Sequence, residues 1–321
     1  MFKHLALLLL LSLALSPHSF GQDRSTAVPI VYSLFASTEL PSLGIGHFLR
    51  EDYGNGSFFA LSEGLTYYLW KTASAKRDTA AYPCVSTQSI LFRRGVRGLS
   101  PDQSAMMQLS GYSYQTCFSL RFLDAFTTYR NYRAGESHTL ALTDQSIGRL
   151  SASAFQWRYL KEPDVYVPLL ISAGASFLDE PQGPSLFKLR SLNWFGSDVS
   201  PATAGVGSIL LETVGFALLA VAEEGFFRGV LQTELSERVN PNFGLIASSV
   251  LFGMAHYPSH GLVYSLRATV AGLYLGWRFK QSGYDLGHTI AIHFYIDFTP
   301  TIIQLFRDPV NARGTYSVGF E

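Results

Sequence analysis

The chain has 321 residues, with 24 Lys and Arg balanced by 24 Asp and Glu, so nothing in its charge indicates a nucleic-acid partner. Charged residues make up 15% of the chain, against roughly 25% in soluble domains. With 47% hydrophobic residues and a mean hydropathy of +0.15, the composition points toward a membrane protein.

The N-terminus predicts a secretory signal. Lys3 and His4 precede a Leu-rich core at residues 5–16, and Pro17 follows it. The core is short for a spanning helix, which needs roughly 20 apolar residues, but it matches the central region of a signal peptide. We expect residues 1–21 to be this signal, with cleavage near its end. An uncleaved anchor is the alternative.

Residues 22–160 are expected to form an N-terminal envelope region with one or two membrane helices. The helical candidates lie at 58–70 and 106–129, separated by polar and basic stretches. The two cysteines, Cys84 and Cys117, are too few for a disulfide framework, although a single disulfide between them is an alternative.

From about residue 161 to the C-terminus the chain is a series of apolar segments with short polar joints. The segments lie at 165–178, 204–227, 243–257, 261–279 and 286–306. Small residues recur in them, and such residues let helices approach closely in lipid. The predicted fold is therefore all-α, a polytopic bundle of transmembrane helices, with no sheet of more than two strands. A soluble helical enzyme with deeply buried helices is the alternative.

A few ionisable residues interrupt these apolar segments, and such residues mark function at membrane depth. In "EEGFFRG", Glu224 and Arg228 are four residues apart, so they share a helix face and are expected to pair. Glu223 is rotated about 100° away and is expected to lack that partner. An unpaired carboxylate in apolar surroundings is suited to act as a general base.

Two further pairs have the same spacing of one helical turn. "FGMAH" places Phe252 one turn before His256, and "HFYID" places His293 one turn before Asp297. A glutamate with two histidines could hold a catalytic zinc ion, or the glutamate could activate water directly. The metalloprotease motif H-E-x-x-H is absent, so no metal ligand is assigned, and both mechanisms stay open.

These three motifs resemble those of the CPBP family of CAAX-processing and bacteriocin-processing intramembrane endopeptidases, also called the Abi family. The family pattern reads EExxxR, FxxxH and HxxxN, and the matching region spans roughly residues 200–306. The resemblance implies that residues 161–321 form a protease domain with a polar intramembrane cavity.

The resemblance also implies a role for each matching residue. Glu223 would activate the hydrolytic water with the help of His256, while Glu224 and Arg228 would structure the cavity. His293 would bind the oxyanion together with its one-turn partner. This chain has Asp297 where the family usually has Asn. Because an ionised carboxylate cannot donate a hydrogen bond, Asp297 would be protonated, orient His293 or bind a cation.

The expected function is therefore intramembrane hydrolysis of a peptide bond in a membrane-associated or exported substrate, in a bacterial-type inner membrane. No cofactor is expected, although a divalent metal such as zinc is not excluded. The expected partners are a peptide or membrane-protein substrate and the lipid bilayer. A metal-dependent protease using the same residues is one alternative. A non-proteolytic scaffold or immunity-type protein of the same fold is another.

Overall fold

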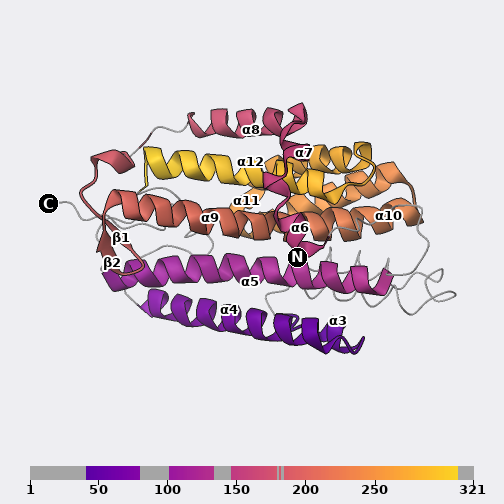
Figure 1. The fold of residues 1–321 in the computed structure, drawn as a ribbon, viewed down its shortest axis with the longest axis horizontal. Coiled ribbons are helices and arrows are strands. Elements are labelled where there is room, and N and C mark those ends of the chain that lie inside the picture. Colours follow the sequence, from indigo (N-terminus) through magenta and orange to yellow (C-terminus); the bar gives the residue numbers. More distant parts are fainter. Residues whose placement is uncertain (1–40, 80–100, 134–145, 179–180, 182–183, 310–321) are drawn as a thin grey trace. The chain divides into compact units, whose positions relative to one another are not determined.

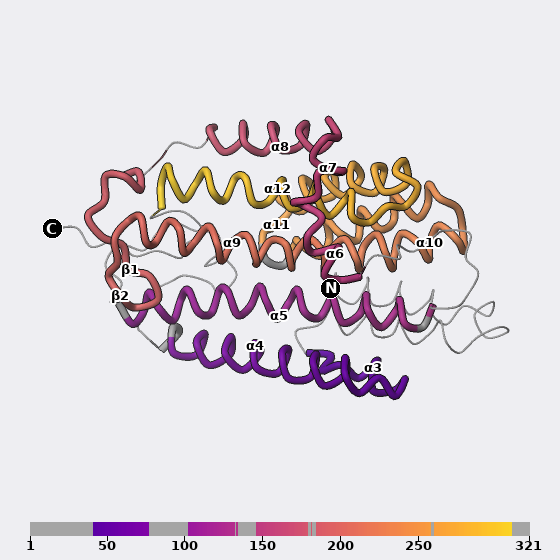
Figure 2. Tube along the Cα trace, viewed as in Figure 1, coloured from indigo at the N-terminus to yellow at the C-terminus, as the bar shows by residue number. Residues whose placement is uncertain are grey.

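The structure, a computed structural model, describes residues 41–79, 101–133, 146–178, 181 and 184–309. The predicted signal peptide and Cys84 lie outside these residues. The described elements are α3 (Ile45–Phe48), α4 (Tyr53–Thr79), α5 (Pro101–Arg133), α6 (Ile147–Ser151), η2 (Ser153–Phe155), α7 (Trp157–Leu160), α8 (Pro163–Ser176), η3 (Leu186–Lys188), β1 (Leu192–Trp194), β2 (Ser197–Val199), α9 (Pro201–Glu224), η4 (Gly225–Gln232), α10 (Thr233–Arg238), α11 (Pro241–Gln281) and α12 (Leu286–Arg307) (Figures 1 and 2).

Two compact units divide the chain. The first consists of Met1–Thr66, Cys117–Ser151 and Ala220–Ile290, and the second of Tyr67–Thr116, Ala152–Leu219 and Ala291–Glu321. Both units are almost entirely helical in the residues described, which confirms the predicted helical class. The division of the chain at residue 160 into an envelope region and a protease domain stays a prediction.

The longest helix of the first unit, α11, is interrupted once. Asn240 caps its start by accepting hydrogen bonds from the backbone N–H groups of Asn242 and Phe243. At Gly261 the backbone has φ 78° and ψ −178°, a conformation that glycine adopts without strain. This break lies where the sequence predicts the joint between the apolar segments 243–257 and 261–279.

Close helix packing in the first unit depends on glycine. A side chain at Gly225 or Gly229 would meet the ring of Phe126 on α5 at 2.6 and 2.7 Å, closer than a real contact allows. Phe126 is fully buried, and on the same helix Phe122 stacks on Phe226 with ring centroids 4.7 Å apart. The glycines after the Glu223–Glu224 pair therefore allow an aromatic face of α5 to pack directly on the backbone that follows it.

A two-stranded hairpin belongs to the second unit. β1 and β2 are antiparallel, and Trp194 pairs with Ser197 next to the turn. Phe195 and Gly196 both have positive φ, the conformation of a tight hairpin turn. Gln108 on α5 holds the turn, since its amide donates to Asn193 O at 3.1 Å and accepts from Phe195 N at 2.7 Å. In the residues described, no larger sheet is present, as predicted.

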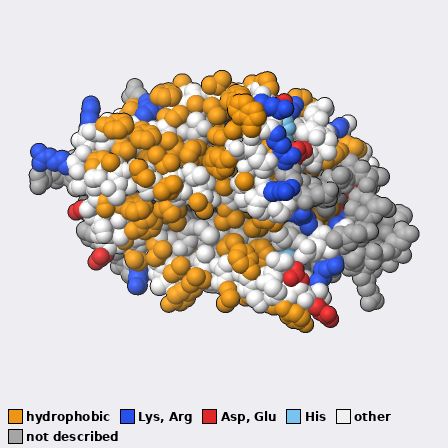
Figure 3. All heavy atoms as spheres, in the orientation of Figure 1, with side chains coloured by type: hydrophobic (Ala, Val, Ile, Leu, Met, Phe, Trp, Pro, Cys, Tyr) orange, Lys and Arg blue, Asp and Glu red, His pale blue; other side chains and the backbone are white. Residues whose placement is uncertain are grey.

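Exposed apolar side chains follow several helices at one-turn spacing. On α9 they are Val206, Leu210 and Val214, and on α11 they include Leu266 and Val270. Figure 3 shows apolar side chains gathered over a wide part of the visible face. A soluble protein seldom exposes such continuous apolar surface, so these stripes are typical of helices that contact lipid.

Among the described residues, one helical stretch is long and apolar enough to cross a membrane. It runs from Pro201 to Arg238, and 39% of its most apolar part is buried, so most of that part is accessible at the surface. The stretch includes the predicted segment 204–227. Spanning by the other apolar segments, and hence the polytopic bundle, stays a prediction.

Candidate active site

The two adjacent glutamates lie at the end of α9, in the first unit, and both are buried. Glu223 is 4% exposed and Glu224 is fully buried. The helix then widens into the π-helical turn η4, which begins at Gly225. Single π-helical turns within α-helices are rare and occur frequently at functional sites.

Arg228, within this π-helical turn, is the central cation of the site and is fully buried. Its Nη1 lies 2.9 Å from Glu224 Oε1, in an ion pair whose two side chains are both inaccessible to solvent. Its Nη2 donates to the backbone oxygen of Gly272 at 3.0 Å. Because a buried charge is costly unless it is paired and hydrogen-bonded, these contacts explain how the guanidinium is kept there. The predicted pairing of Glu224 with Arg228 is confirmed.

The prediction that Glu223 lacks this partner stays a prediction. The charge of Glu223 also acts on Arg228. The sequence argument assumed a regular α-helix, in which residues four apart share a face. In a π-helical turn the hydrogen bonds run from residue i to i+5, and Glu223 and Arg228 are five residues apart. The sequence argument did not allow for this change of helix geometry.

The site extends from Arg228 to Phe252 and His256 on α11. The guanidinium carbon of Arg228 lies 4.7 Å from the centre of the Phe252 ring, a cation–π geometry. The Phe252 and His256 rings are also 4.7 Å apart between centroids. The prediction that a ring lies one turn from this imidazole is confirmed, and Glu224, Arg228, Phe252 and His256 form a continuous series of contacts.

The orientation of His256 is set by its own helix. Its Nδ1 lies 2.8 Å from the backbone oxygen of Phe252. A carbonyl oxygen can only accept a hydrogen bond, so Nδ1 carries the proton, and in the neutral ring the lone pair is on Nε2. This is the tautomer that a histidine needs in order to accept a hydrogen bond from water through Nε2.

Gln232, which the sequence analysis did not single out, ties the π-helical turn to α11. Its Nε2 donates to the backbone oxygen of Gly276 at 2.8 Å, one turn along from the bond between Arg228 and Gly272. The recurring small residues predicted close helix approach, but they gave no sign that Arg228 and Gln232 use the carbonyl groups of Gly272 and Gly276. Together the two bonds hold the Glu-bearing helix against α11.

His293 and Asp297 lie on α12, in the second unit. His293 Nε2 is 3.3 Å from Asp297 Oδ2, and the two side chains are 5% and 26% exposed. The predicted pairing of these two residues is confirmed. The prediction that His293 lines one cavity with Glu223 and His256 stays a prediction, because those residues belong to the first unit.

A metal centre would need several ligand side chains close together. In the described part of the chain, no group of three or more His, Cys, Asp or Glu side chains could hold a metal ion. The donor set for a His2Glu zinc site is therefore not assembled among the described residues of either unit.

A family model matches part of the C-terminal half of the chain. Residues 205–299 match a family described as type II CAAX prenyl endopeptidase Rce1-like. The stretch is less than a third of the chain, but it contains all seven predicted site residues. Neither the curated proteins nor the solved structures gave a match. The family model thus confirms, for residues 205–299, the resemblance to the CAAX protease family, whose Rce1-like members are membrane-embedded proteases.

Proposed function

We propose that this chain is an intramembrane endopeptidase that uses Glu223 to activate the hydrolytic water. The observation that carries the proposal is the buried set of Glu223, Glu224 and Arg228, which contacts Phe252 and through it His256, inside the region that matches a protease family. A buried arginine with two carboxylates is costly to maintain. A hydrolytic site gives a reason for keeping such a group in an apolar helix.

The chemistry is a direct attack of water on the peptide carbonyl. Glu223 takes a proton from the water, and His256 accepts a hydrogen bond from the same water through Nε2. The water oxygen bonds to the carbonyl carbon, and the carbonyl oxygen becomes an oxyanion. Glu223 then delivers its proton to the amide nitrogen as the carbon–nitrogen bond breaks, leaving a carboxyl and an amine end.

Arg228 and Glu224 have supporting roles in this mechanism. The ion pair and the bond from Arg228 to the Gly272 carbonyl hold the π-helical turn on α11, which fixes the position of Glu223 relative to His256. Because a displacement of about 1 Å can cost 10²-fold in rate, this positioning matters as much as the base itself.

His293 binds the oxyanion in this proposal. Of the three roles left open for Asp297, its distance of 3.3 Å from His293 Nε2 favours orientation of the imidazole. An ionised Asp297 also favours a protonated ring, which is a stronger donor to an oxyanion than a neutral one. In this role aspartate replaces the amide of the family pattern without donating a hydrogen bond itself.

The substrate is a peptide segment of a membrane-associated or exported protein, and the chain acts within a bacterial-type inner membrane. The exposed apolar stripes on α9 and α11 and the membrane-embedded family support a location in the bilayer. On this proposal the apolar segments of residues 161–321 complete a polytopic bundle around a polar cavity. A prenylated CAAX substrate is not part of the proposal.

The test does not require a known substrate. Membranes from cells that express the wild-type chain, Glu223→Gln or Glu51→Gln are compared by mass spectrometry of protein N-termini. Glutamine keeps the shape of Glu223 but cannot act as the base, so the N-termini created by the wild type should disappear at unchanged protein abundance. Glu51 is exposed, and its variant is the control that should keep them. The same N-termini in Glu223→Gln would contradict the proposal.

A further inference from the structure

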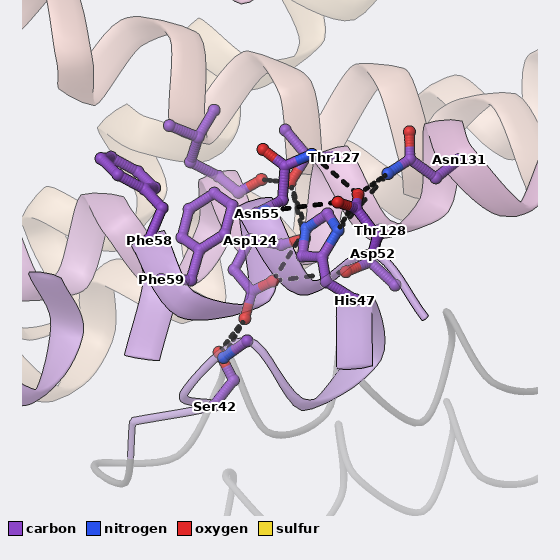
Figure 4. A network of polar contacts seen from close by, with 12 residues as sticks. Ser42, His47, Asp52, Asn55, Phe58, Phe59, Asp124, Thr127, Thr128 and Asn131 are labelled. Carbon is purple, nitrogen blue, oxygen red and sulfur yellow. Dashed lines mark hydrogen bonds and ion pairs between the residues drawn. The ribbon is translucent and has the colours of Figure 1, made fainter. Parts of the chain in front are cut away.

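A polar network lies in the first unit, outside the region that matches the family (Figure 4). It joins residues 41–52, which include α3, to Glu63 on α4 and Asp124 on α5. Ser42, His47, Glu63 and Asp124 are each no more than 5% exposed. Figure 4 shows His47 between Asp124 and Asp52, with Ser42 next to Asp124. The proposed hydrolysis uses none of these residues.

The contacts of Ser42 require an additional proton. Its Oγ lies 3.0 and 3.1 Å from the two carboxyl oxygens of Glu63 and 2.7 Å from Oδ2 of Asp124. A serine hydroxyl has one hydrogen to donate, whereas two ionised carboxylates only accept. If both were ionised, one carboxylate would face the lone pairs of Ser42 without a hydrogen between them. The geometry is satisfied when one carboxyl group is protonated and donates to Ser42, which donates to the other.

Backbone N–H groups also donate hydrogen bonds to the carboxyl groups of Glu63 and Asp124. Leu43 N donates to Glu63 Oε2 at 2.8 Å, and Gly44 N donates to Asp124 Oδ2 at 3.2 Å. Leu43 and Gly44 have φ values of 53° and 66°, and the left-handed region is unfavourable for leucine. The two carboxyl groups therefore hold a strained turn of the chain against α4 and α5.

The ring of His47 lies beside the pair. Its Nδ1 faces Asp52 Oδ2 at 3.2 Å. Its Nε2 faces Thr127 Oγ1 at 3.0 Å and Asp124 Oδ1 at 3.3 Å. Thr127 donates its own hydrogen to a backbone carbonyl, so its oxygen accepts from the ring. Asn131 Nδ2 also lies 3.3 Å from Nδ1. Nε2 therefore faces two acceptors and carries a proton, while Nδ1 lies between the Asp52 carboxylate and the Asn131 amide.

Asp52 is the outer, ionised member of the network. Its side chain is 30% exposed, and hydrogen bonds from Asn55 hold its pKa below the ordinary value. Asn131 donates to it as well, at 3.1 Å. The ring of His47 therefore lies between an accessible carboxylate and the buried pair.

One proton on the buried pair limits the negative charge that is buried there. The groups that act on the pair are His47 from residues 41–52 and Arg121 from α5, and Asp52 lies on the far side of His47. With one proton on the pair, the two carboxyl groups carry a single negative charge. Without that proton, a further negative charge is buried, which is costly where water is excluded.

We propose that Glu63 and Asp124 form a binding site for one proton, and that this proton fastens residues 41–52 to α4 and α5. Loss of the proton places two carboxylates on one serine hydroxyl. Their repulsion weakens the bonds from Ser42, Leu43 and Gly44, so the attachment of the segment depends on pH.

Infrared spectroscopy of the full chain in phosphatidylcholine vesicles tests the shared proton. We expect the carbonyl stretch of a protonated carboxyl group at neutral pH, with its loss as the pH is raised toward about 9. The band should be missing from Glu63→Gln and from Asp124→Asn, and present in Glu51→Gln. No such band in the wild type at neutral pH overturns the proposal, and so does a band that survives in both variants. If one variant does not fold, the wild type and the other variant still decide.

Hydrogen–deuterium exchange of residues 41–52 tests the attachment. After correction for the intrinsic pH dependence of exchange, protection in the wild type should fall about tenfold for each pH unit once the proton is lost, since one proton is linked to the opening. In Glu63→Gln the amide keeps both hydrogen bonds without a titrating proton, so protection should not depend on pH. Wild-type protection that stays constant while the infrared band disappears overturns the attachment.

Discussion

Replacing Arg228 by Met removes the central cation of the site but keeps most of the length and volume of the side chain. Glu224 then stays fully buried without its ion-pair partner, and the Gly272 carbonyl loses its donor. Breaking a buried ion pair by removing one member costs about 3–5 kcal/mol. We expect Arg228→Met to reduce the free energy of unfolding by this amount.

A double variant that also removes the charge of Glu224 separates the loss of the ion pair from the loss of packing. In Glu224→Gln/Arg228→Met the uncompensated Glu224 charge is gone, so part of the lost stability should return. The coupling energy between the two sites should be about 2 kcal/mol, within the range for residues in direct contact. Recovery is incomplete because Glu223 and the Gly272 carbonyl still lack the arginine, and an unsatisfied carbonyl alone costs about 1–3 kcal/mol.

The assay is reversible denaturation of the purified full chain in mixed micelles, with helix content followed by circular dichroism. Arg267→Met, which removes an exposed arginine from α11, is the control. It should change the free energy of unfolding by no more than about 0.5 kcal/mol. If the effects of Arg228→Met and Glu224→Gln simply add, the two residues do not stabilise the site as a pair, and the reasoning is refuted.

Two other predictions concern Asp297 and the close contact of α5 with Gly225. If the mechanism uses no metal, a chelator should not change the activity of Asp297→Asn. If a metal ion takes part, the same substitution should lower activity by roughly 10–100-fold, and added metal should partly restore it. Gly225→Ala should destabilise the protein by about 1–3 kcal/mol, because the new methyl group would lie 2.6 Å from the ring of Phe126. Gly174→Ala, on α8 with open space around it, should instead be neutral or stabilise by up to about 1 kcal/mol. A tolerated Gly225→Ala would show that α5 does not approach this closely.

The parts of the site that the sequence predicted are those within one helix. Glu224 with Arg228 and His293 with Asp297 are each four residues apart, and regular helical geometry brings such residues together. The position of Glu223 relative to Arg228 was less predictable, because a π-helical turn changes helix geometry, and nothing in the spacing of apolar residues distinguishes a π-helix from an α-helix. The sequence argument therefore reaches its limit where the helix departs from its regular form.

Contacts between helices were less accessible from the sequence. The buried pair of Glu63 and Asp124 is joined by Ser42, which is 82 residues from Asp124, and no local pattern connects them. Arg121 and Asp124 were visible only as interruptions of an apolar segment. Their role depends on which helix packs against which, and this information becomes available only with the fold.

Hydrolysis by the purified chain in water labelled with oxygen-18 tests the central claim most directly. The reconstituted wild type and Glu223→Gln are given a membrane-protein substrate identified from its new N-terminus. We expect the label in the new carboxyl end, and a rate for Glu223→Gln lower by about 10²–10⁴-fold, the contribution of a general base. Cleavage at the wild-type rate by Glu223→Gln would contradict the assignment of Glu223 as the base that activates water.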